Sequence, residues 1–533
     1  METPSAAELI GKVRIIPIRT DTAIPPRIGD ASTLIFTRFP SHFIKLEIGG
    51  PTINPAAAPV QIDIYCVNDL HGRLRAAENA PGAARLAAAL NLLTAANPKG
   101  TLIVGGGDML SGSIDADSFE GLNAVEAMNL MGFAANCAGN HAFDYNFPAI
   151  VRQAKAADFP LLAANITAAN GNIPAPFAPY AVVKRNGIKT GIIGVLDEQA
   201  FKKVNPDRVA GLKLTSPAEA ANKYAVELRR NGVQIVVLLA HIGGQMENGM
   251  LTGAIVPVLD NLKGIDAVAS GDSHTVFACS YKGIPAVQAG EYGRQIGHIK
   301  LFYDADTGKI TQAEANVYET DALTQERDSK AAAFLQPYFE RVDAVYSKVL
   351  AYNTQYLANE KYGESPLADY FMDLINGELQ TDITLYNGGA IRANLPAGNV
   401  TLRELKQIFP FNNTLYVVRL RGSDILKALE HGLGSKEIGR VRFAGLTATA
   451  DLTAPEGGRL ISAQLADGSM LNPERYYSVA VNDFLLSGGD GYTSVKGSEI
   501  IRESGKDLDV LRMALKKAGQ INFDYNNKRL ILK

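Results

Sequence analysis

The chain has 533 residues and a mass of 57.0 kDa, which is more than one hydrophobic core usually supports, so we expect at least two domains. Hydrophobic residues make up 47% of the sequence and charged residues 20%, which excludes a disordered or fibrous protein. The 52 basic and 55 acidic residues give a net charge of −3, so the composition argues against a nucleic acid polymer as the main partner.

Residues 1–60 differ from the rest of the chain and are expected to form an N-terminal extension, because proline recurs there without a sustained hydrophobic period. The start of the chain lacks the basic and apolar regions of a secretory signal, so the sequence leaves export open. No apolar run reaches the roughly 20 residues of a membrane span. The three cysteines, Cys66, Cys137 and Cys279, lie in or beside apolar runs and are expected to be buried thiols.

From residue 61 on, short β-branched runs alternate with segments of helical period, which is typical of layered α/β folds. We expect eight strands up to residue 290 and three more in a second mixed α/β block. The expected strands are 62–67, 101–104, 134–138, 161–164, 191–195, 234–239, 267–270 and 286–288, followed by 383–386, 415–420 and 477–481.

A charged stretch of helical period at residues 323–350 is the expected connector between two domains. We therefore expect one domain over residues 61–322 and a second over residues 351–533.

Almost every strand expected before residue 290 is followed at once by a side chain that can bind a metal. The carboxyl ends of strands in open α/β sheets face one crevice, so these side chains should converge there. Carboxylate, imidazole and amide groups together suit two adjacent divalent cations such as Mn²⁺ or Zn²⁺, which support displacement at phosphorus. Each motif alone is more typical of a turn, but five in the order of one domain indicate a metal centre. The candidates are Asp69, His71, Asp108, Asn140, His141, His241, Asp272 and His274, with Asp144 three residues after His141.

The order of these motifs resembles a known family. Asp69-Leu-His-Gly72, Gly106-Gly-Asp108, Gly139-Asn-His-Ala-Phe-Asp144, a strand ending in His241 and Gly271-Asp-Ser-His274 are similar to the bacterial 5′-nucleotidase and 2′,3′-cyclic-nucleotide phosphodiesterase family of calcineurin-like metallophosphoesterases. Asn387-Gly-Gly-Ala-Ile-Arg392, Phe409-Pro-Phe-Asn-Asn413 and Phe484-Leu-Leu-Ser-Gly-Gly-Asp-Gly-Tyr492 extend the resemblance to the second block. The resemblance implies an α/β fold: a four-layer αββα metallophosphoesterase sandwich followed by a mixed α/β 5′-nucleotidase C-terminal domain that binds substrate.

The resemblance also implies a role for each matching residue. One metal would be held by Asp69, His71 and His274 and the other by Asn140, His241 and Asp272, with Asp108 bridging the two. His141 would be the catalytic histidine and Asp144 would orient it. Arg392 and Arg421 would grip phosphate, Phe484 would stack on the base, and Asp490 would accept hydrogen bonds from ribose hydroxyls.

Two positions depart from the family pattern. Asp272 stands where the family usually has histidine, which makes the second metal site more anionic and predicts a bias toward Mn²⁺ over Zn²⁺. The position of the second stacking aromatic is taken by Arg440, with Phe443 three residues later on the other face of a strand, so the partner of Phe484 stays open.

We therefore expect a dimetal phosphohydrolase that releases phosphate from nucleoside monophosphates by attack of metal-bound hydroxide. A 2′,3′-cyclic-nucleotide phosphodiesterase or a nucleotide-sugar hydrolase is the alternative among enzymes, and a non-catalytic surface binding protein on the same fold is the alternative outside them. The retained pair of His141 and Asp144 favours catalysis, since a binding protein has no evident need for it. By the resemblance the protein would act in the periplasm or at the cell surface, and its preferred nucleotide and oligomeric state stay open.

Overall fold

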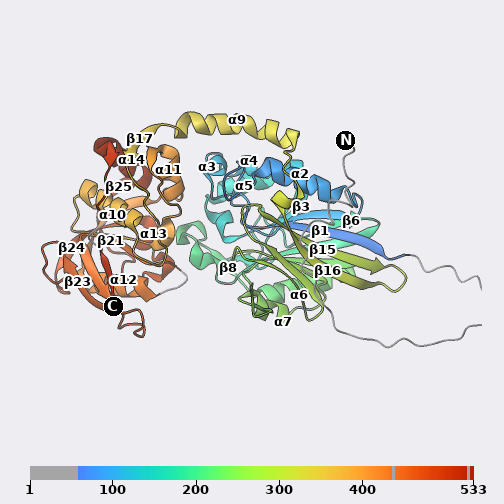
Figure 1. The fold of residues 1–533 in the computed structure, drawn as a ribbon. Helices are drawn as coiled ribbons and strands as arrows, with labels where there is room; N and C mark the ends of the chain where they lie inside the picture. The colour runs from blue at the N-terminus through green and yellow to red at the C-terminus, as the bar shows by residue number, and fades with distance from the viewer. Residues whose placement is uncertain (1–57, 435–437, 525–527) are drawn as a thin grey trace, which may run out of the picture.

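The computed structural model describes residues 58–434, 438–524 and 528–533, so the predicted extension at 1–60 lies outside the described residues apart from 58–60. Two compact parts of the chain lie side by side, and helix α9 (Ser329–Tyr346) bridges them along one edge (Figure 1). Among the helices of the described residues, none is long and apolar enough to cross a lipid bilayer.

The N-terminal part is built on two six-stranded sheets. The first contains β1 (Val60–Val67), β2 (Thr101–Gly105), β3 (Phe133–Cys137), β4 (Leu161–Leu162), β15 (Gln295–Asp304) and β16 (Lys309–Glu319), in the order β16-β15-β1-β2-β3-β4. The second contains β6 (Tyr180–Arg185), β7 (Ile188–Leu196), β9 (Ile235–His241), β12 (Ala267–Ser270), β13 (Val276–Tyr281) and β14 (Ile284–Ala289), in the order β13-β14-β12-β9-β7-β6. In each sheet four neighbouring strands are parallel and the outer partners are antiparallel.

Four layers result, because the two sheets pack face to face and helices cover their outer faces. Side chains such as Ile64 and Val104 from the first sheet and Val237 and Leu239 from the second form the core between the sheets. Helices α2 (Ala83–Thr94), α4 (Leu122–Met131) and α5 (Phe147–Ala156) pack on the first sheet, and α9 packs on α2 and α4. Helices α6 (Pro217–Arg230) and α7 (Ile255–Asp260) pack on the second sheet. The predicted αββα sandwich is thereby confirmed.

The C-terminal part has a mixed five-stranded sheet with helices on both faces, which confirms the second half of the predicted fold. The order is β21 (Arg442–Ala444), β18 (Ile383–Tyr386), β24 (Tyr476–Asn482), β20 (Thr414–Arg421) and β25 (Glu499–Lys506). One face packs against α10 (Pro366–Leu379), α11 (Leu402–Ile408) and α14 (Asp507–Ala518). The other face packs against α12 (Gly422–Gly434) and the sheet formed by β22 (Leu446–Ala450), β23 (Leu460–Leu465) and β27 (Leu530–Leu532).

The remaining elements are short. They are α3 (Ile114–Asp117), α8 (Thr320–Leu323), α13 (Asp483–Leu486), β5 (Ile166–Ala168), β8 (Leu212–Leu214), β10 (Gln245–Glu247), β11 (Met250–Thr252), β17 (Val349–Asn353), β19 (Gly398–Thr401) and β26 (Gln520–Ile521), with the 3₁₀ helices η1 (Asn140–Phe143), η2 (Ala200–Lys203), η3 (Pro206–Arg208), η4 (Gly388–Ala390) and η5 (Gly489–Gly491).

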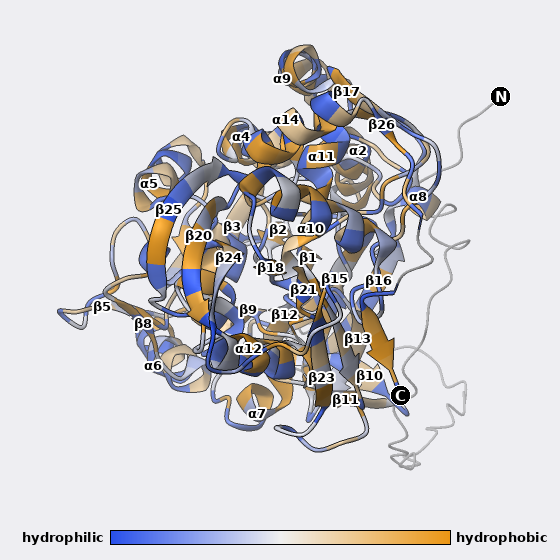
Figure 2. Cartoon of the chain, turned by 90° about the vertical axis from the view of Figure 1, so that its left-hand side faces the viewer, coloured by the Kyte–Doolittle hydropathy of each residue, from blue (hydrophilic) through white to orange (hydrophobic). Residues whose placement is uncertain are grey.

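Local sequence explains why these elements form. The parallel strand β9 is buried along its whole length, so it needs an unbroken apolar run instead of an alternating one. Helices α5, α6 and α10 each begin with Asn or Ser, whose side chain accepts a hydrogen bond from an amide of the first turn, and each carries proline in that turn. In Figure 2, α5 and α10 carry both orange and blue residues, as helices with one buried face should.

All eleven expected strands overlap observed strands, and all three cysteines are buried and unpaired. Helix α9 lies inside the stretch that the sequence marks as a connector.

Candidate metal centre and the adjoining cleft

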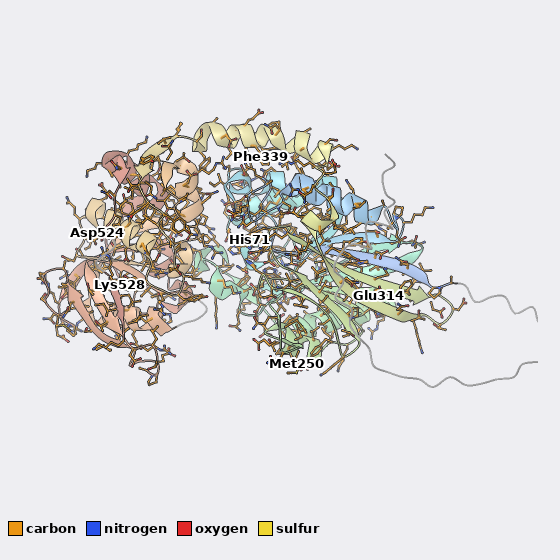
Figure 3. All side chains as sticks on the ribbon, in the orientation of Figure 1. His71, Met250, Glu314, Phe339, Asp524 and Lys528 are labelled. Carbon is orange, nitrogen blue, oxygen red and sulfur yellow. The ribbon has the colours of Figure 1, made fainter. Side chains whose placement is uncertain are left out.

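The candidate metal ligands lie where parallel strands of both sheets end. Asp69 and His71 follow β1, Asp108 follows β2, and Asn140 begins η1 directly after β3. From the second sheet, His241 is the last residue of β9, while Asp272 and His274 follow β12. Figure 3 shows His71 on the side of the N-terminal part that is turned toward the C-terminal part.

The ligand atoms of five of these side chains form one continuous centre together with His141. Within each of three groups the ligand atoms all lie within 4.8 Å of one another. The groups are Asp69, His71 and His274; His71, Asp108 and His141; and Asp69, Asp108 and His241. Because the groups share members, the arrangement offers neighbouring positions for more than one cation.

Atoms left without partners show that a cation suits this centre. The Nε2 atoms of His71 and His274 approach each other to 3.1 Å. The Nε2 atom of His241 lies 3.0 Å from an oxygen of Asp108, yet it makes no hydrogen bond to the described residues, and neither does the buried Oδ1 of Asn140. Buried polar atoms rarely lack a partner, so these converging donors fit a divalent cation with mixed nitrogen and oxygen ligands.

Three site histidines are oriented through their second ring nitrogen. The Nδ1 atom of His241 donates to the carbonyl of Gly106 at 2.9 Å, and the Nδ1 atom of His274 lies 2.6 Å from Glu291. The Nδ1 atom of His141 lies 2.7 Å from Asp144. Such contacts fix the ring and turn the other nitrogen toward the centre, as is usual around metals.

The backbone at the centre is strained. Non-glycine residues rarely adopt a left-handed conformation, because the Cβ atom then approaches the backbone. Asp69, His71, Asp108, Asp272 and His274 all do so, with φ angles of 50°, 48°, 52°, 78° and 58°. Next to them, a Cβ atom on Gly139 would lie 2.0 Å from an oxygen of Asp108, so only glycine fits there.

Charge at the centre is distributed among close partners. Burial lowers the pKa of a histidine, but facing carboxylates raise the pKa of His241 to about 10, chiefly through Asp108, and that of His141 to about 9, chiefly through Asp144. Burial and the neighbouring His141 hold the pKa of His71 well below its ordinary value. Burial would raise the pKa of Asp108, but His241 and His141 lower it below its usual range.

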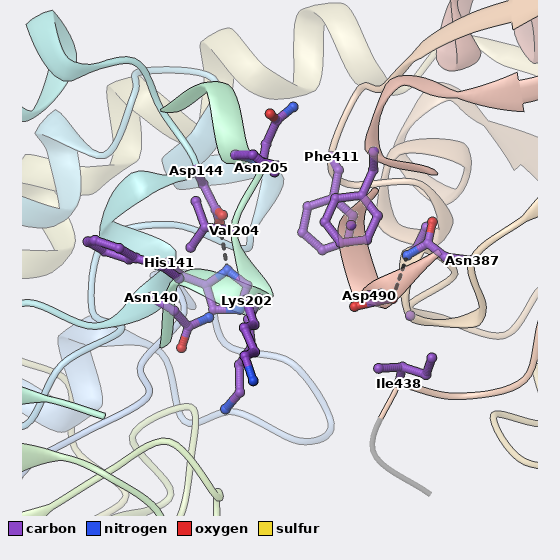
Figure 4. A pocket seen from close by; sticks show the side chains of 18 of the residues that line it. Asn140, His141, Asp144, Lys202, Val204, Asn205, Asn387, Phe411, Ile438 and Asp490 are labelled. Carbon is purple, nitrogen blue, oxygen red and sulfur yellow. Dashed lines mark hydrogen bonds and ion pairs between the residues drawn. The ribbon is translucent and has the colours of Figure 1, made fainter. Parts of the chain in front are cut away.

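A cavity of about 820 Å³ adjoins the centre and is lined by both parts of the chain. In Figure 4, Asn140, His141 and Asp144 lie on one side and Phe411, Asn387 and Asp490 on the other. Phe484, Arg392, Asp272 and His274 also line this cavity, so it joins the candidate ligands to predicted substrate-binding residues.

Three predicted residues of the C-terminal part meet at this cavity. Arg392 follows η4, and Phe484 in α13 packs so closely on Gly489 that a Cβ atom there would lie 2.6 Å from the ring. Asp490 accepts a hydrogen bond of 3.4 Å from the amide of Asn387. Burial raises the pKa of Asp490 to about 6, although Asn387 and two nearby cationic groups oppose the shift.

Arg421 does not reach the cavity. It is the last residue of β20, in which Leu420 faces the core, so the alternation of the strand turns Arg421 outward. There its half-exposed side chain forms an ion pair with Glu474. The expectation that Arg421 faces the cleft was therefore wrong.

The aromatic residue that accompanies Phe484 on the C-terminal wall of the cavity is Phe411. Neither Arg440 nor Phe443 lines the cavity. Phe443 lies in β21 and is only 4% exposed, because its ring packs into the core. The ring of Phe411 instead lines it, near parallel to the ring of His141 with centroids 6.5 Å apart. The sequence carried a signal for this residue, since Phe411 lies in the Phe409-Pro-Phe-Asn-Asn413 motif, but no role was attached to it.

Comparison with known proteins gives a consistent result. Residues 344–497 match the family model described as 5′-nucleotidase, C-terminal domain. Endonuclease YhcR of Bacillus subtilis (strain 168) is 28% identical over 456 residues, which cover 80% of this chain and 37% of that protein. A 5′-nucleotidase of Bos taurus is 25% identical over 525 residues, which cover 87% of this chain and 89% of that protein.

Among solved structures, a 5′-nucleotidase precursor from Thermus thermophilus matches with a TM-score of 0.77 and 28% identity, covering 89% of this chain and 99% of that one. The likeness to the two 5′-nucleotidases thus spans nearly their whole length, whereas the chain spans well under half of the endonuclease. Together with the domain match and the confirmed sandwich, this shows that the chain is similar to 5′-nucleotidases over both of its parts, and that residues 344–497 match their C-terminal domain.

Proposed function

We propose that the protein is a dimetal phosphohydrolase that releases phosphate from nucleoside monophosphates. One observation carries the proposal: a single cavity has four candidate metal ligands on one wall, next to the rest of the centre, and two aromatic rings with Asp490 on the other wall. A ligand with a phosphate at one end and a flat base at the other suits such a cavity.

On the metal side, we assign two cations, Mn²⁺ or Zn²⁺, to the centre formed by Asp69, His71, Asp108, Asn140, His241 and His274. When bound, such cations neutralise charge on phosphoryl oxygens and lower the pKa of water. His141 holds a proton for the departing ester oxygen, and Asp144 fixes its ring through the contact of 2.7 Å. Arg392 binds phosphoryl oxygens from the opposite wall, where its planar guanidinium suits two parallel contacts.

On the nucleoside side, Phe411 and Phe484 stack on the base and Asp490 accepts hydrogen bonds from ribose hydroxyls. Residues 61–322 then perform the chemistry and residues 351–533 bind the nucleoside, with residues 323–350 connecting them. In this division of work the substrate bridges the two parts, so hydrolysis needs both.

A substrate panel with controlled metal content tests the proposal. AMP, UDP-glucose, 2′,3′-cyclic AMP and an aryl phosphodiester are assayed before chelation, after it, and after addition of Mn²⁺ or Zn²⁺. AMP should be hydrolysed fastest, and activity should vanish on chelation and return with metal. Faster turnover of the cyclic nucleotide or of UDP-glucose would instead favour the alternative enzymes, and no turnover by metal-loaded protein would favour a binding protein.

Substitutions check the two walls separately. Asp108→Asn should abolish hydrolysis while circular dichroism stays unchanged, because it removes a shared ligand of two groups.

Phe411→Ala and Phe484→Ala should each raise KM for AMP by about tenfold, the size expected for one lost stacking contact. KM for a small aryl phosphate should stay unchanged in both, and equal losses on the two substrates argue against base stacking.

We further propose that the protein acts outside the cytoplasm, as the family resemblance implies. Fractionation of the native host with an antibody to the chain tests this, and recovery in the cytoplasmic fraction alone contradicts it.

A further inference from the structure

An ion pair occupies the edge of the proposed second cation position. The Nζ atom of Lys203 lies 2.7 Å and 2.8 Å from the two carboxylate oxygens of Asp272. One of these oxygens lies 3.8 Å from the Nε2 atom of His241. The side chain of Asp272 is 13% exposed and that of Lys203 is 48% exposed. Both oxygens of a predicted metal ligand are thus already engaged by an ammonium group.

The segment that carries Lys203 is fixed in place. In and next to η2, Ala200 and Val204 are buried, and the ring of Phe201 meets that of Phe143 edge to face at 5.2 Å. Just before η2, the amide of Asp197 donates to the carbonyl of His241 at 3.2 Å. These contacts tie η2 to the strand end that carries a candidate ligand, so the position of Lys203 follows from packing.

Lys203 retains capacity for an anion. An ammonium group has three donors, and Asp272 accepts from it at both oxygens, so one donor is left for the cavity. Lys203 and Arg392 line the same cavity, one from each part of the chain, together with the candidate metal ligands Asp108, Asn140 and His274. The charges of Lys203 and Asp272 cancel, so the pair supplies the centre with a positively charged hydrogen-bond donor and leaves its net charge unchanged.

We propose that Lys203 is a phosphate-binding residue of this centre, and that Asp272 is its anchor and not a metal ligand. This inference rests on the proposed phosphohydrolase function. The second cation position is then held by Asp108, Asn140 and His241, and the reason for a Mn²⁺ bias at that position falls away.

Inhibition by inorganic phosphate and metal content together test the role of Lys203. The metal-loaded protein is assayed with an aryl phosphate, and the inhibition constant of phosphate is compared with bound metal per chain. Lys203→Met should weaken phosphate binding by about tenfold, the size expected for one charged hydrogen bond, with metal content unchanged. Lys202→Met is the matched control, because Lys202 is the neighbouring residue of η2 and also borders the cavity. It should change the constant by less than about threefold, since Lys202 is exposed to solvent and exposed, screened charges contribute little.

A double-mutant cycle tests whether Asp272 acts through Lys203. Asp272→Asn alone should weaken phosphate binding and leave metal content unchanged, and the double variant should bind phosphate no more weakly than Lys203→Met. Loss of about one metal per chain in Asp272→Asn would identify Asp272 as a ligand and overturn the proposal. So would equal effects of the two lysine variants, or additive effects in the cycle.

The outcome is separable from that of the proposed function. Turnover of AMP by the wild-type protein tests the proposed function, whereas the differences between these variants test Lys203.

Discussion

Among the residues that the structure describes, the carboxylate of Asp144 is joined to the metal centre through the ring of His141, which makes Asp144 a positioning residue for His141. Its carboxylate accepts from Nδ1 of His141 and from the hydroxyl of Ser111 at 3.0 Å. Asp144→Asn should therefore lower kcat for AMP by about a hundredfold, within the range of proton-transfer catalysis, and change KM by less than about threefold.

Ser111→Ala is the control for this prediction, because it removes one contact to Asp144 and leaves the carboxylate on the ring. It should lower kcat far less than Asp144→Asn. Equal losses in the two variants, or a loss confined to KM, would mean that the pair serves structure or binding.

Asp490 should give nucleotide binding a pH dependence. With a pKa of about 6, its carboxyl is protonated at pH 5 and ionised at pH 7. Only the ionised form accepts two ribose hydroxyls well, so KM for AMP should rise as pH falls through 6. The phosphate of the substrate also titrates near pH 6. An aryl phosphate shares that titration and lacks ribose, so the ratio of the two KM values isolates Asp490, and Asp490→Asn should make this ratio independent of pH.

Ligands that directly follow a strand are predictable from the sequence, whereas residues that reach the cavity through packing between distant segments are not. His71, Asp108 and His241 each follow an apolar run directly, and parallel strand ends must meet. Lys203 and Phe411 reach the cavity only because of how η2 packs and how the two parts of the chain face each other. Those contacts join residues far apart in sequence. The Phe409-Pro-Phe-Asn-Asn413 motif therefore marks Phe411 without giving its place in the cavity, and no local pattern marks Lys203.

Strands that the sequence predicts also differ in burial from strands that it does not predict. Many of the predicted strands, such as β7 and β9, carry continuous apolar runs because neighbours cover both faces. The antiparallel strands β6, β16 and β25 were not predicted. Strand β25 is largely exposed, and β6 and β16 are partly exposed. All three are held by backbone pairing with β20, β7 and β15, so their side-chain pattern is weaker than that of a buried strand.

Helix α10 carries a buried acid that should make stability depend on pH. Asp369 is 7% exposed, and burial together with the facing Glu364 raises the pKa of its carboxyl above the ordinary value. The folded state therefore binds a proton that the unfolded state has released above about pH 4. The contribution of Asp369 to the free energy of unfolding is present at low pH and declines as pH rises from there.

Asp369→Asn replaces this acid by a neutral group of the same shape. In urea denaturation, wild-type protein should be more stable relative to Asp369→Asn at pH 5 than at pH 8. Asp382→Asn serves as a control, because that exposed carboxylate bonds Ser478 near the surface and should not reproduce the trend. A difference between wild type and Asp369→Asn that stays constant or grows with pH contradicts the assignment.

At the scale of the whole molecule, a network of ion pairs ties α9 to both parts of the chain. Asp343 on α9 pairs with Arg75 of the N-terminal part at 3.1 Å and with Arg403 at the start of α11 in the C-terminal part. Arg75 also pairs with Asp115 at 3.0 Å. The network borders a second cavity of about 210 Å³, which is also lined by His71 and His141. The ion pairs therefore lie close to the place where the proposed substrate contacts both parts of the chain.

Asp343→Asn should loosen the relative placement of the two parts more than it lowers stability. The side chain of Asp343 is about half exposed, so the free energy of unfolding should change by less than about 1 kcal/mol. With the link weakened, small-angle scattering should give a larger radius of gyration. KM for AMP should rise more than KM for an aryl phosphate, because the aryl phosphate meets the C-terminal part only at Arg392, whereas AMP also meets Phe411, Phe484 and Asp490. Asp321→Asn removes an exposed pair with Arg85 inside the N-terminal part and is the matched control. A scattering profile and KM for AMP that are the same in both variants would show that the network does not set the placement of the two parts.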